Sequence, residues 1–191
     1  MSREPVSLGA TPSQTVGPFF HFGLAVNAEL GRLAGPGTKG TRIRLRIRVT
    51  DGDGVPVPDA LIELWQADAD GKYAPAERPS GDAPDAFSGF GRLPTDADGT
   101  CLFETIHPGV VPDEQGRRQA PHINVCFFAR GLLRQVYTRI YFDGDAGLDE
   151  DAILALVPVE RRQTLVARRG DGEWIFDVRL QGDCETVFFD L

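Results

Sequence analysis

The segment that decides the fold covers residues 42–50 and reads R-I-R-L-R-I-R-V-T. Charged and apolar residues alternate along it, which is the two-residue period of a strand with one buried face. Ile43, Leu45, Ile47 and Val49 share one face, and the intervening arginines share the other. We therefore expect a half-buried strand whose arginine face is solvated or, alternatively, meets an acidic partner.

Seven further short runs have strand-like composition, and Asp-Gly turn signals separate several of them. They are Ala60–Trp65, Cys101–Ile106, His122–Phe128, Val136–Phe142, Thr164–Ala167, Trp174–Leu180 and Thr186–Phe189. Only Asp149–Leu156 has a helical pattern, with acidic residues at its start. The sequence thus predicts an all-β fold, an antiparallel β-sandwich of about eight strands with one short helix. Trp65 is expected to be buried within its strand.

The first forty residues differ from the rest of the chain. They hold four prolines and no sustained hydrophobic period. We expect residues 1–40 to form an extended N-terminal arm that packs against a partner subunit, and residues 41–191 to form the β-sandwich.

Charge and composition exclude several classes of protein. Twenty Lys and Arg residues against 28 Asp and Glu residues leave a net charge of −8, which argues against a general binder of nucleic acid or anionic membranes. No apolar run approaches the roughly 20 residues that a membrane helix needs. The three cysteines are widely spaced and odd in number, as expected for free thiols in a reducing cytoplasm.

Three D-x-D-G stretches could be calcium loops or tight turns: Asp51–Gly54, Asp68–Gly71 and Asp96–Gly99. Only the middle one approaches the spacing of a calcium loop, but its first ligand would be Gln66 and a strand precedes it. We expect turns at all three. The histidines, only three in number, are each more often structural than catalytic in such settings. Composition and spacing therefore predict an all-β domain with an unusual N-terminal arm and indicate no specific function.

Several sequence blocks, in order along nearly the whole chain, resemble the intradiol ring-cleavage dioxygenases. The blocks are Thr11–Thr15, Pro56–Asp68, Gly71–Tyr73, Thr95–Gly99, Pro108–Gly109, Ala120–Asn124, Phe128–Gly131 and Glu185–Asp190. Catalytic members of this family hold Fe(III) with two tyrosines and two histidines.

The chain departs from that ligand set at two of four positions. Tyr73 and His122 match the first tyrosine and the first histidine. Val111 and Asn124 stand where the second tyrosine and the second histidine would be. A valine offers no donor, and an amide is a poor substitute for imidazole on Fe(III). We therefore expect no metal site in this chain.

The resemblance implies a non-catalytic subunit of a hetero-oligomeric dioxygenase. A homologous beta subunit would hold the Fe(III), and the pair would cleave the catechol protocatechuate with O2. Thr15, Gly17, Pro18 and Arg130 would then help to form the substrate pocket, with Arg130 facing the substrate carboxylate. Arg130 lies eight residues after His122, so strand alternation predicts the same side for both. The arm could instead only wrap the partner, and Arg130 could form an interface salt bridge.

Two alternatives remain open on the sequence. One is a non-enzymatic binding module similar to transthyretin-like sandwiches, because Pro58–Leu64 and Asp96–Gly99 share their pattern. The other is a self-sufficient intradiol dioxygenase with an altered iron shell.

Overall fold

The alternating segment forms the central strand of one sheet layer in the computed structural model, which describes residues 10–74, 87–113 and 115–190. This strand is β1 (Arg42–Thr50). Its four aliphatic side chains are buried, three of them completely. It pairs in parallel with β10 (Trp174–Arg179) and antiparallel with β4 (Thr100–Ile106). The predicted half-buried strand is confirmed.

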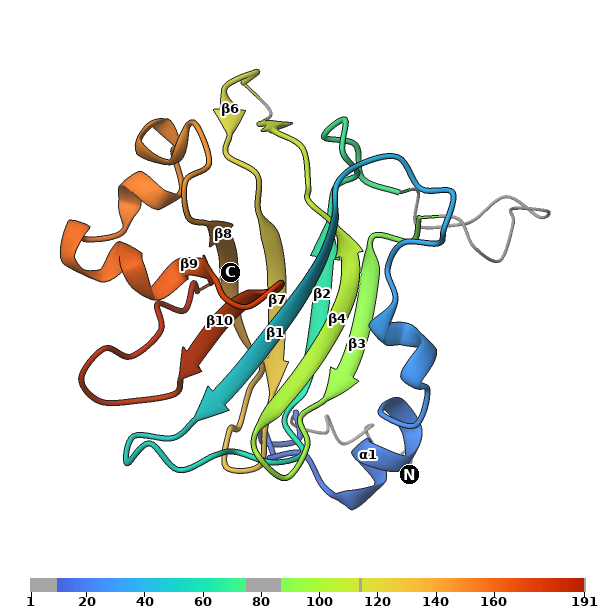
Figure 1. Ribbon diagram of the computed structural model, residues 1–191. Helices are drawn as coiled ribbons and strands as arrows, with labels where there is room; N and C mark the ends of the chain where they lie inside the picture. Colours follow the sequence, from blue (N-terminus) through green and yellow to red (C-terminus); the bar gives the residue numbers. More distant parts are fainter. Residues whose placement is uncertain (1–9, 75–86, 114, 191) are drawn as a thin grey trace, which may run out of the picture.

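Eight strands form one hydrogen-bonded sheet in the order β3-β2-β7-β8-β9-β10-β1-β4, which folds into two layers (Figure 1). The remaining members are β2 (Leu61–Gln66), β3 (Phe90–Pro94), β7 (Ile123–Phe128), β8 (Val136–Phe142) and β9 (Val166–Arg169). A separate ribbon pairs β5 (Val111–Pro112) with β6 (Arg118–Gln119). The main core lies between the layers β3-β2-β7-β8 and β9-β10-β1-β4, and Phe103, Phe127 and Phe176 lie almost fully buried in it. The all-β sandwich is confirmed.

Two pairings are parallel, which the purely antiparallel expectation did not include. β8 pairs with β9 and β1 pairs with β10 in parallel register. The chain between β8 and β9, residues 143–165, is long enough to return to the starting end of β8, as a parallel pairing requires. The β8–β9 pair is the junction at which one layer continues into the other.

Three local predictions were wrong. Residues 149–156 form no α-helix but two 3-10 turns, η2 (Leu148–Glu150) and η3 (Leu154–Leu156). The carboxylate of Asp151 accepts hydrogen bonds from the backbone N–H groups of Ile153 and Leu154, and so starts a new turn inside the segment. The run 186–189 makes one isolated bridge, between Phe189 and Tyr137, instead of a strand. β3 was not expected, because glycine and proline interrupt its pattern.

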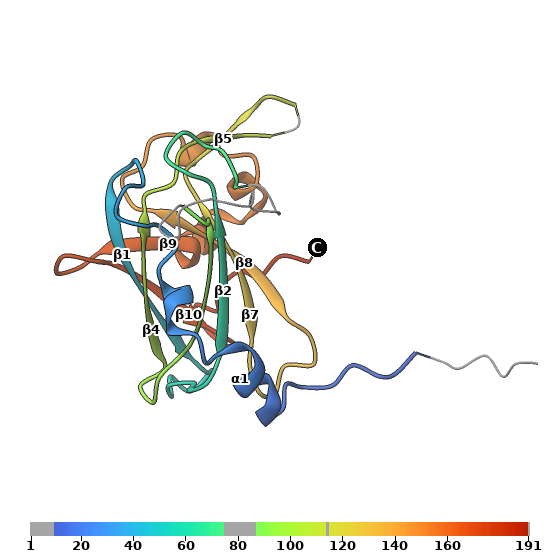
Figure 2. The ribbon, with the colours of Figure 1, turned by 90° about the vertical axis from the view of Figure 1, so that its right-hand side faces the viewer.

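The N-terminal arm is not extended throughout. It contains the helix α1 (Pro18–Leu24) and the 3-10 turn η1 (Ala28–Gly31). Figure 2 shows the beginning of the described arm running away from the sandwich, whereas Thr15, just before α1, contacts it at Ala129 and Gly131. The end of the arm instead packs on this chain's own core, where Leu33 and Ala34 are buried. Within the described ranges, no helix is long and apolar enough to cross a bilayer.

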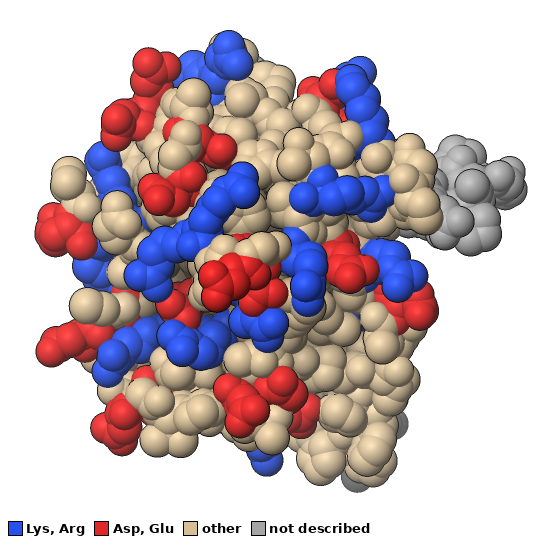
Figure 3. Space-filling view, viewed as in Figure 1, with Lys and Arg blue, Asp and Glu red and all other residues tan. Residues whose placement is uncertain are grey.

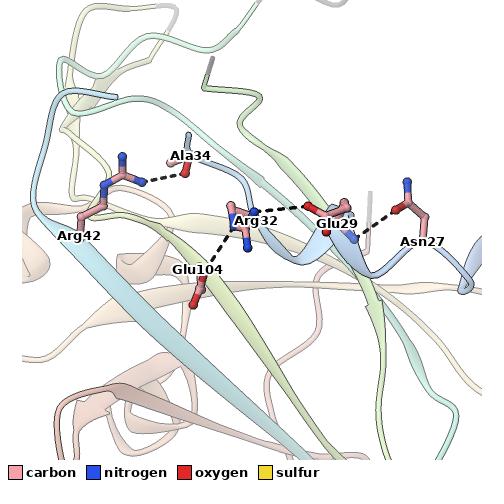
Figure 4. A network of polar contacts seen from close by, with 6 residues as sticks. All are labelled: Asn27, Glu29, Arg32, Ala34, Arg42 and Glu104. Carbon is pink, nitrogen blue, oxygen red and sulfur yellow. Dashed lines mark hydrogen bonds and ion pairs between the residues drawn. The ribbon is translucent and has the colours of Figure 1, made fainter. Parts of the chain in front are cut away.

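Polar contacts fasten this later part of the arm to the β1–β4 edge (Figure 4). Arg32 pairs with Glu104 of β4 at 3.4 Å and with Glu29 at 3.3 Å. The guanidinium of Arg42 donates to the carbonyl oxygen of Ala34 at 2.7 Å. Residues 28–35 are therefore part of the sandwich, and only the segment up to α1 remains an arm.

The arginine face of β1 is solvated, and arginines on it form ion pairs with acidic residues of the same chain. Arg46 binds Glu173, and Arg48 binds Asp177 of β10 at 2.8 Å. The hydrogen bond from Arg46 holds the pKa of the Glu173 carboxyl below its usual value. Positive and negative groups accordingly alternate over this face (Figure 3), and Arg44, Arg46 and Arg48 have acidic partners within the chain.

Trp65 is a correction to the sequence analysis. Its side chain is 47% exposed, because it lies on the outward face of β2, whereas Leu64 points into the core. The ring packs sideways against Phe90 of the neighbouring strand, with centroids 6.5 Å apart.

The three D-x-D-G stretches are turns, as expected. In each, one carboxylate oxygen of the first aspartate accepts hydrogen bonds from two backbone N–H groups, at 2.9–3.0 Å. An Asp side chain used in this way mimics a backbone turn.

Substitution of Phe103 by alanine should lower the free energy of unfolding by about 3–5 kcal/mol, because the ring is completely buried between the layers. Trp65→Ala should cost clearly less, since half of that ring already faces solvent. Chemical denaturation of both variants checks this. Equal losses would contradict the orientation of β2.

Candidate functional site

Tyr73 is held by the turn that follows β2. Asp68 closes this turn through hydrogen bonds from the N–H groups of Asp70 and Lys72, both 2.9 Å long. Gly71 has a φ of +78°, and a Cβ atom there would lie 2.0 Å from the carbonyl oxygen of Val110. Only glycine fits this approach, which brings the Tyr73 loop against the chain that leads into β5.

Tyr73, His122 and Asn124 form a hydrogen-bonded cluster at the start of β7. The Nδ1 atom of His122 lies 2.8 Å from the carbonyl oxygen of Ala120, to which it can only donate. Its Nε2 atom is therefore an acceptor and faces the Tyr73 hydroxyl at 3.4 Å. Asn124 donates from Nδ2 to the same hydroxyl oxygen at 3.1 Å. The phenol is thus shared between an imidazole and an amide.

His122 is held neutral by its surroundings. Its side chain is 1% exposed, and burial, followed by the nearby charge of Arg139, lowers its pKa from 6.5 to about 4. Asp151 fixes the chain on the other side, because its carboxylate accepts from the N–H of Ala120 at 2.8 Å and from the hydroxyl of Tyr141 at 3.0 Å.

The donor set at this cluster does not fit Fe(III). Tyr73 and His122 are the only two of the four expected positions with a phenolate or imidazole donor. Val111 lies buried in β5 and has no donor atom, and the amide of Asn124 turns its N–H towards the phenol. Among the described residues, no group of three or more His, Cys, Asp or Glu could hold a metal ion. We derive no chemistry through iron at this place.

The four residues expected to line a substrate pocket meet at the other end of β7. The hydroxyl of Thr15 accepts from the N–H of Gly131 at 2.8 Å and lies 3.4 Å from the carbonyl oxygen of Ala129. Gly17, Pro18 and Arg130 line one recess of about 150 Å³ beside this contact. Arg130 is exposed. The structure therefore brings the arm and Arg130 together.

The two clusters are far apart within this chain. His122 precedes β7 and Arg130 follows it in a turn, so strand parity does not test the predicted common side. At roughly 3.3 Å per residue, the six residues of β7 between them span about 20 Å. A ligand of the size of a catechol cannot touch both clusters at once.

A wide groove crosses the outer face of the layer β3-β2-β7-β8, and the sequence analysis did not identify it. It has a volume of about 600 Å³, and five aromatic side chains contribute to its lining together with aliphatic and polar ones. Among its residues are Trp65, Phe90, Asn124, Phe128, Tyr137 and Phe189. The exposed position of Trp65, not recognised from the sequence, was the signal that could have revealed it.

Comparison with known proteins adds the family context. A family model described as dioxygenase matches residues 15–182. The chain is 42% identical to the protocatechuate 3,4-dioxygenase alpha chain of Pseudomonas putida, covering 96% of this chain and 98% of that one. It is 37% identical to the protocatechuate 3,4-dioxygenase beta chain of Burkholderia cepacia, covering 68% of this chain and 56% of that one. The solved hydroxyquinol 1,2-dioxygenase from Pseudomonas putida DLL-E4 has a similar fold, with a TM-score of 0.62 at 23% identity, over 91% of this chain and 67% of that one.

Acidification should destabilise the protein through His122. Between pH 6.5 and about 4 the unfolded chain protonates this histidine and the folded chain does not, so stability falls as the pH falls. Full protonation of His122 should lower the free energy of unfolding by about 3 kcal/mol, at 1.36 kcal/mol per unit of pKa difference. His122→Asn stays neutral throughout and should show a shallower pH dependence in denaturant titrations. Parallel curves for the two proteins would refute a buried neutral His122.

Proposed function

The chain belongs to the dioxygenase family whose model covers residues 15–182, and we propose that it acts as the alpha subunit of a protocatechuate 3,4-dioxygenase. In this role it forms the substrate pocket together with an iron-carrying beta subunit, and the assembled enzyme cleaves protocatechuate with O2 to 3-carboxy-cis,cis-muconate. The likeness to an alpha chain over nearly the full length of both proteins carries this proposal.

The reaction's Fe(III) belongs to the partner in this proposal. The cluster Tyr73–His122–Asn124 supports this division, since its polar atoms are already paired with one another. The chain's similarity to a beta chain also supports a partner of related fold. Alone, the chain would have no site at which to activate O2 or a catechol.

This chain contributes a wall and a positive charge. The guanidinium of Arg130 is exposed and free to bind the substrate carboxylate with two parallel hydrogen bonds. Thr15, Gly17 and Pro18 lie beside it and would cover the bound ring, which excludes water from the reacting face. Gly17 allows close approach of the backbone because it has no side chain.

Of the predicted arm, residues 1–40, the part up to α1 would contact the beta subunit. Helix α1 carries Phe19 and Phe22, which are 86% and 67% exposed. Two large aromatic side chains on a seven-residue helix with no buried residue fit a surface that a partner covers. We further propose a cytoplasmic location, which the free thiols of Cys101, Cys126 and Cys184 support.

The purified chain alone should hold no stoichiometric iron, show no tyrosinate-to-iron colour and cleave no catechol. Co-expression with its beta subunit should yield a coloured, active complex. Metal analysis, visible absorption and oxygen uptake check this. One tightly bound iron per isolated chain, with turnover, would instead establish a self-sufficient dioxygenase.

Arg130→Ala in the assembled enzyme should raise the KM for protocatechuate. Loss of a charge-assisted hydrogen bond costs about 1.5–3 kcal/mol, which corresponds to roughly ten- to a hundredfold in kcat/KM. Catechol, which lacks the carboxylate, should be affected far less. Arg130→Lys should recover part of the loss, because it keeps the charge without the planar fork.

Arg134→Ala is the matched control, since Arg134 is an exposed arginine only four residues further along the chain. It should leave both substrates unaffected. Dissociation of the Arg130→Ala complex in size-exclusion chromatography, or equal losses on both substrates, would make Arg130 an interface residue and contradict its role at the carboxylate.

A further inference from the structure

A short hydrogen bond between an imidazole and a carboxylate, the His21–Asp59 pair, joins α1 to the sandwich beside the recess that Arg130 lines. The Nδ1 atom of His21 lies 2.6 Å from a carboxylate oxygen of Asp59, which belongs to the loop between β1 and β2. Both side chains are about 40% exposed, and both line the same recess as Gly17 and Pro18. Nothing in the proposed chemistry requires either group to touch a substrate.

Asp59 occupies a backbone conformation that an amino acid with a side chain seldom adopts. Its φ is +60°, in the left-handed region. The neighbouring chain imposes this conformation: the N–H of Asp59 donates to the carbonyl oxygen of Thr95 at 3.0 Å, and the N–H of Ala60 donates to the Thr95 hydroxyl at 2.9 Å. Glycine would fill the position without strain, yet the chain keeps a carboxylate there. Strained positions persist where the surrounding structure holds them, as Thr95 does here, and they cluster at functional sites.

Helix α1 needs external attachments to keep its place. It has seven residues, none of them buried, and a helix of this length is not stable alone in water. Besides the His21–Asp59 hydrogen bond, its contacts with the sandwich include Phe20, whose ring lies 5.2 Å from that of Phe128. Just before the helix, Thr15 binds the chain on either side of Arg130. The arm segment 15–18 therefore runs between two points of attachment, Thr15 and the His21–Asp59 pair.

We infer that His21 and Asp59 are positioning residues, whose hydrogen bond fixes α1 and thereby holds the segment 15–18 at a set distance from Arg130. This inference rests on the proposed function, because the segment matters only if it forms part of the pocket. The pair acts through the arm. It keeps residues 15–18 at a fixed position relative to the guanidinium of Arg130, so that a bound substrate contacts both.

The first test measures the attachment itself in the assembled complex. Asp59→Gly removes the carboxylate and also relieves the backbone strain, so a purely local role predicts an unchanged or more stable protein. Positioning predicts faster hydrogen–deuterium exchange at residues 15–25, by about two- to fivefold, the range expected for a half-exposed hydrogen-bonded pair. Asp53→Gly, in the same loop and exposed, is the matched control and should leave exchange in the arm unchanged.

The second test asks whether the two residues act through each other. His21→Ala, Asp59→Gly and the double variant are compared for turnover of protocatechuate. Each should raise KM about two- to fivefold with kcat nearly unchanged, and the double variant should be no worse than either single one. Additive losses would show that the residues act independently and would overturn the inference.

The result for Arg130 separates this inference from the proposed function. If Asp59→Gly leaves hydrogen–deuterium exchange at residues 15–25 unchanged, the inference is overturned, whatever the kinetic result. Faster exchange in Asp59→Gly with an unchanged KM for protocatechuate also overturns the inference. If Arg130→Ala still raises KM in that case, the proposed function stands without the inference. If neither Arg130→Ala nor Asp59→Gly affects KM, the proposed role of Arg130 at the substrate carboxylate fails as well, whereas the alpha-subunit role is decided separately by co-expression with the beta subunit. Phe20→Ala, which removes the neighbouring contact and leaves the sandwich intact, should reproduce the faster exchange.

Discussion

The four aliphatic side chains and the four arginines of β1 must lie on opposite faces of one strand, and the rest of the sandwich accommodates this separation. The buried face requires a second layer, which β2, β7 and β8 provide. The charged face requires acids on neighbouring strands, which Glu173 and Asp177 provide from the β10 region. Because the apolar face has a second layer to pack against and the charged face has acidic partners, β1 is stable as an interior strand between β10 and β4.

Alternation in the sequence was sufficient to predict the class of fold, because period-two patterning is a local property. β1, β4, β7 and β8 appear within a residue of their predicted bounds. The wrong predictions fall where a distant group decides the local structure. Asp151 splits the expected helix because its carboxylate also binds Tyr141, 10 residues away, and Ala120, 31 residues away in the sequence. Trp65 was placed in the core because alternation does not say which face of β2 meets the other layer.

For the candidate site, too, some features could be predicted from the sequence and others could not. The types of residue at Tyr73, Val111, His122 and Asn124 were sufficient to argue against an iron centre, since donor chemistry can be read from the sequence. The separation of His122 from Arg130 along β7 could not be inferred from strand parity alone. The role inferred for Asp59 was also inaccessible, because it depends on a left-handed backbone and on a partner 38 residues earlier in the chain.

The hydrogen-bonded trio of Tyr73, His122 and Asn124 has a consequence for biosynthesis. In a metalloprotein the loop that carries a ligand is closed by the ion, so folding and metal supply are coupled. In the proposed assembly the partner holds the Fe(III), and hydrogen bonds within this chain close the corresponding loop. On that proposal this chain would fold without waiting for iron, whereas its partner would depend on the supply of the metal.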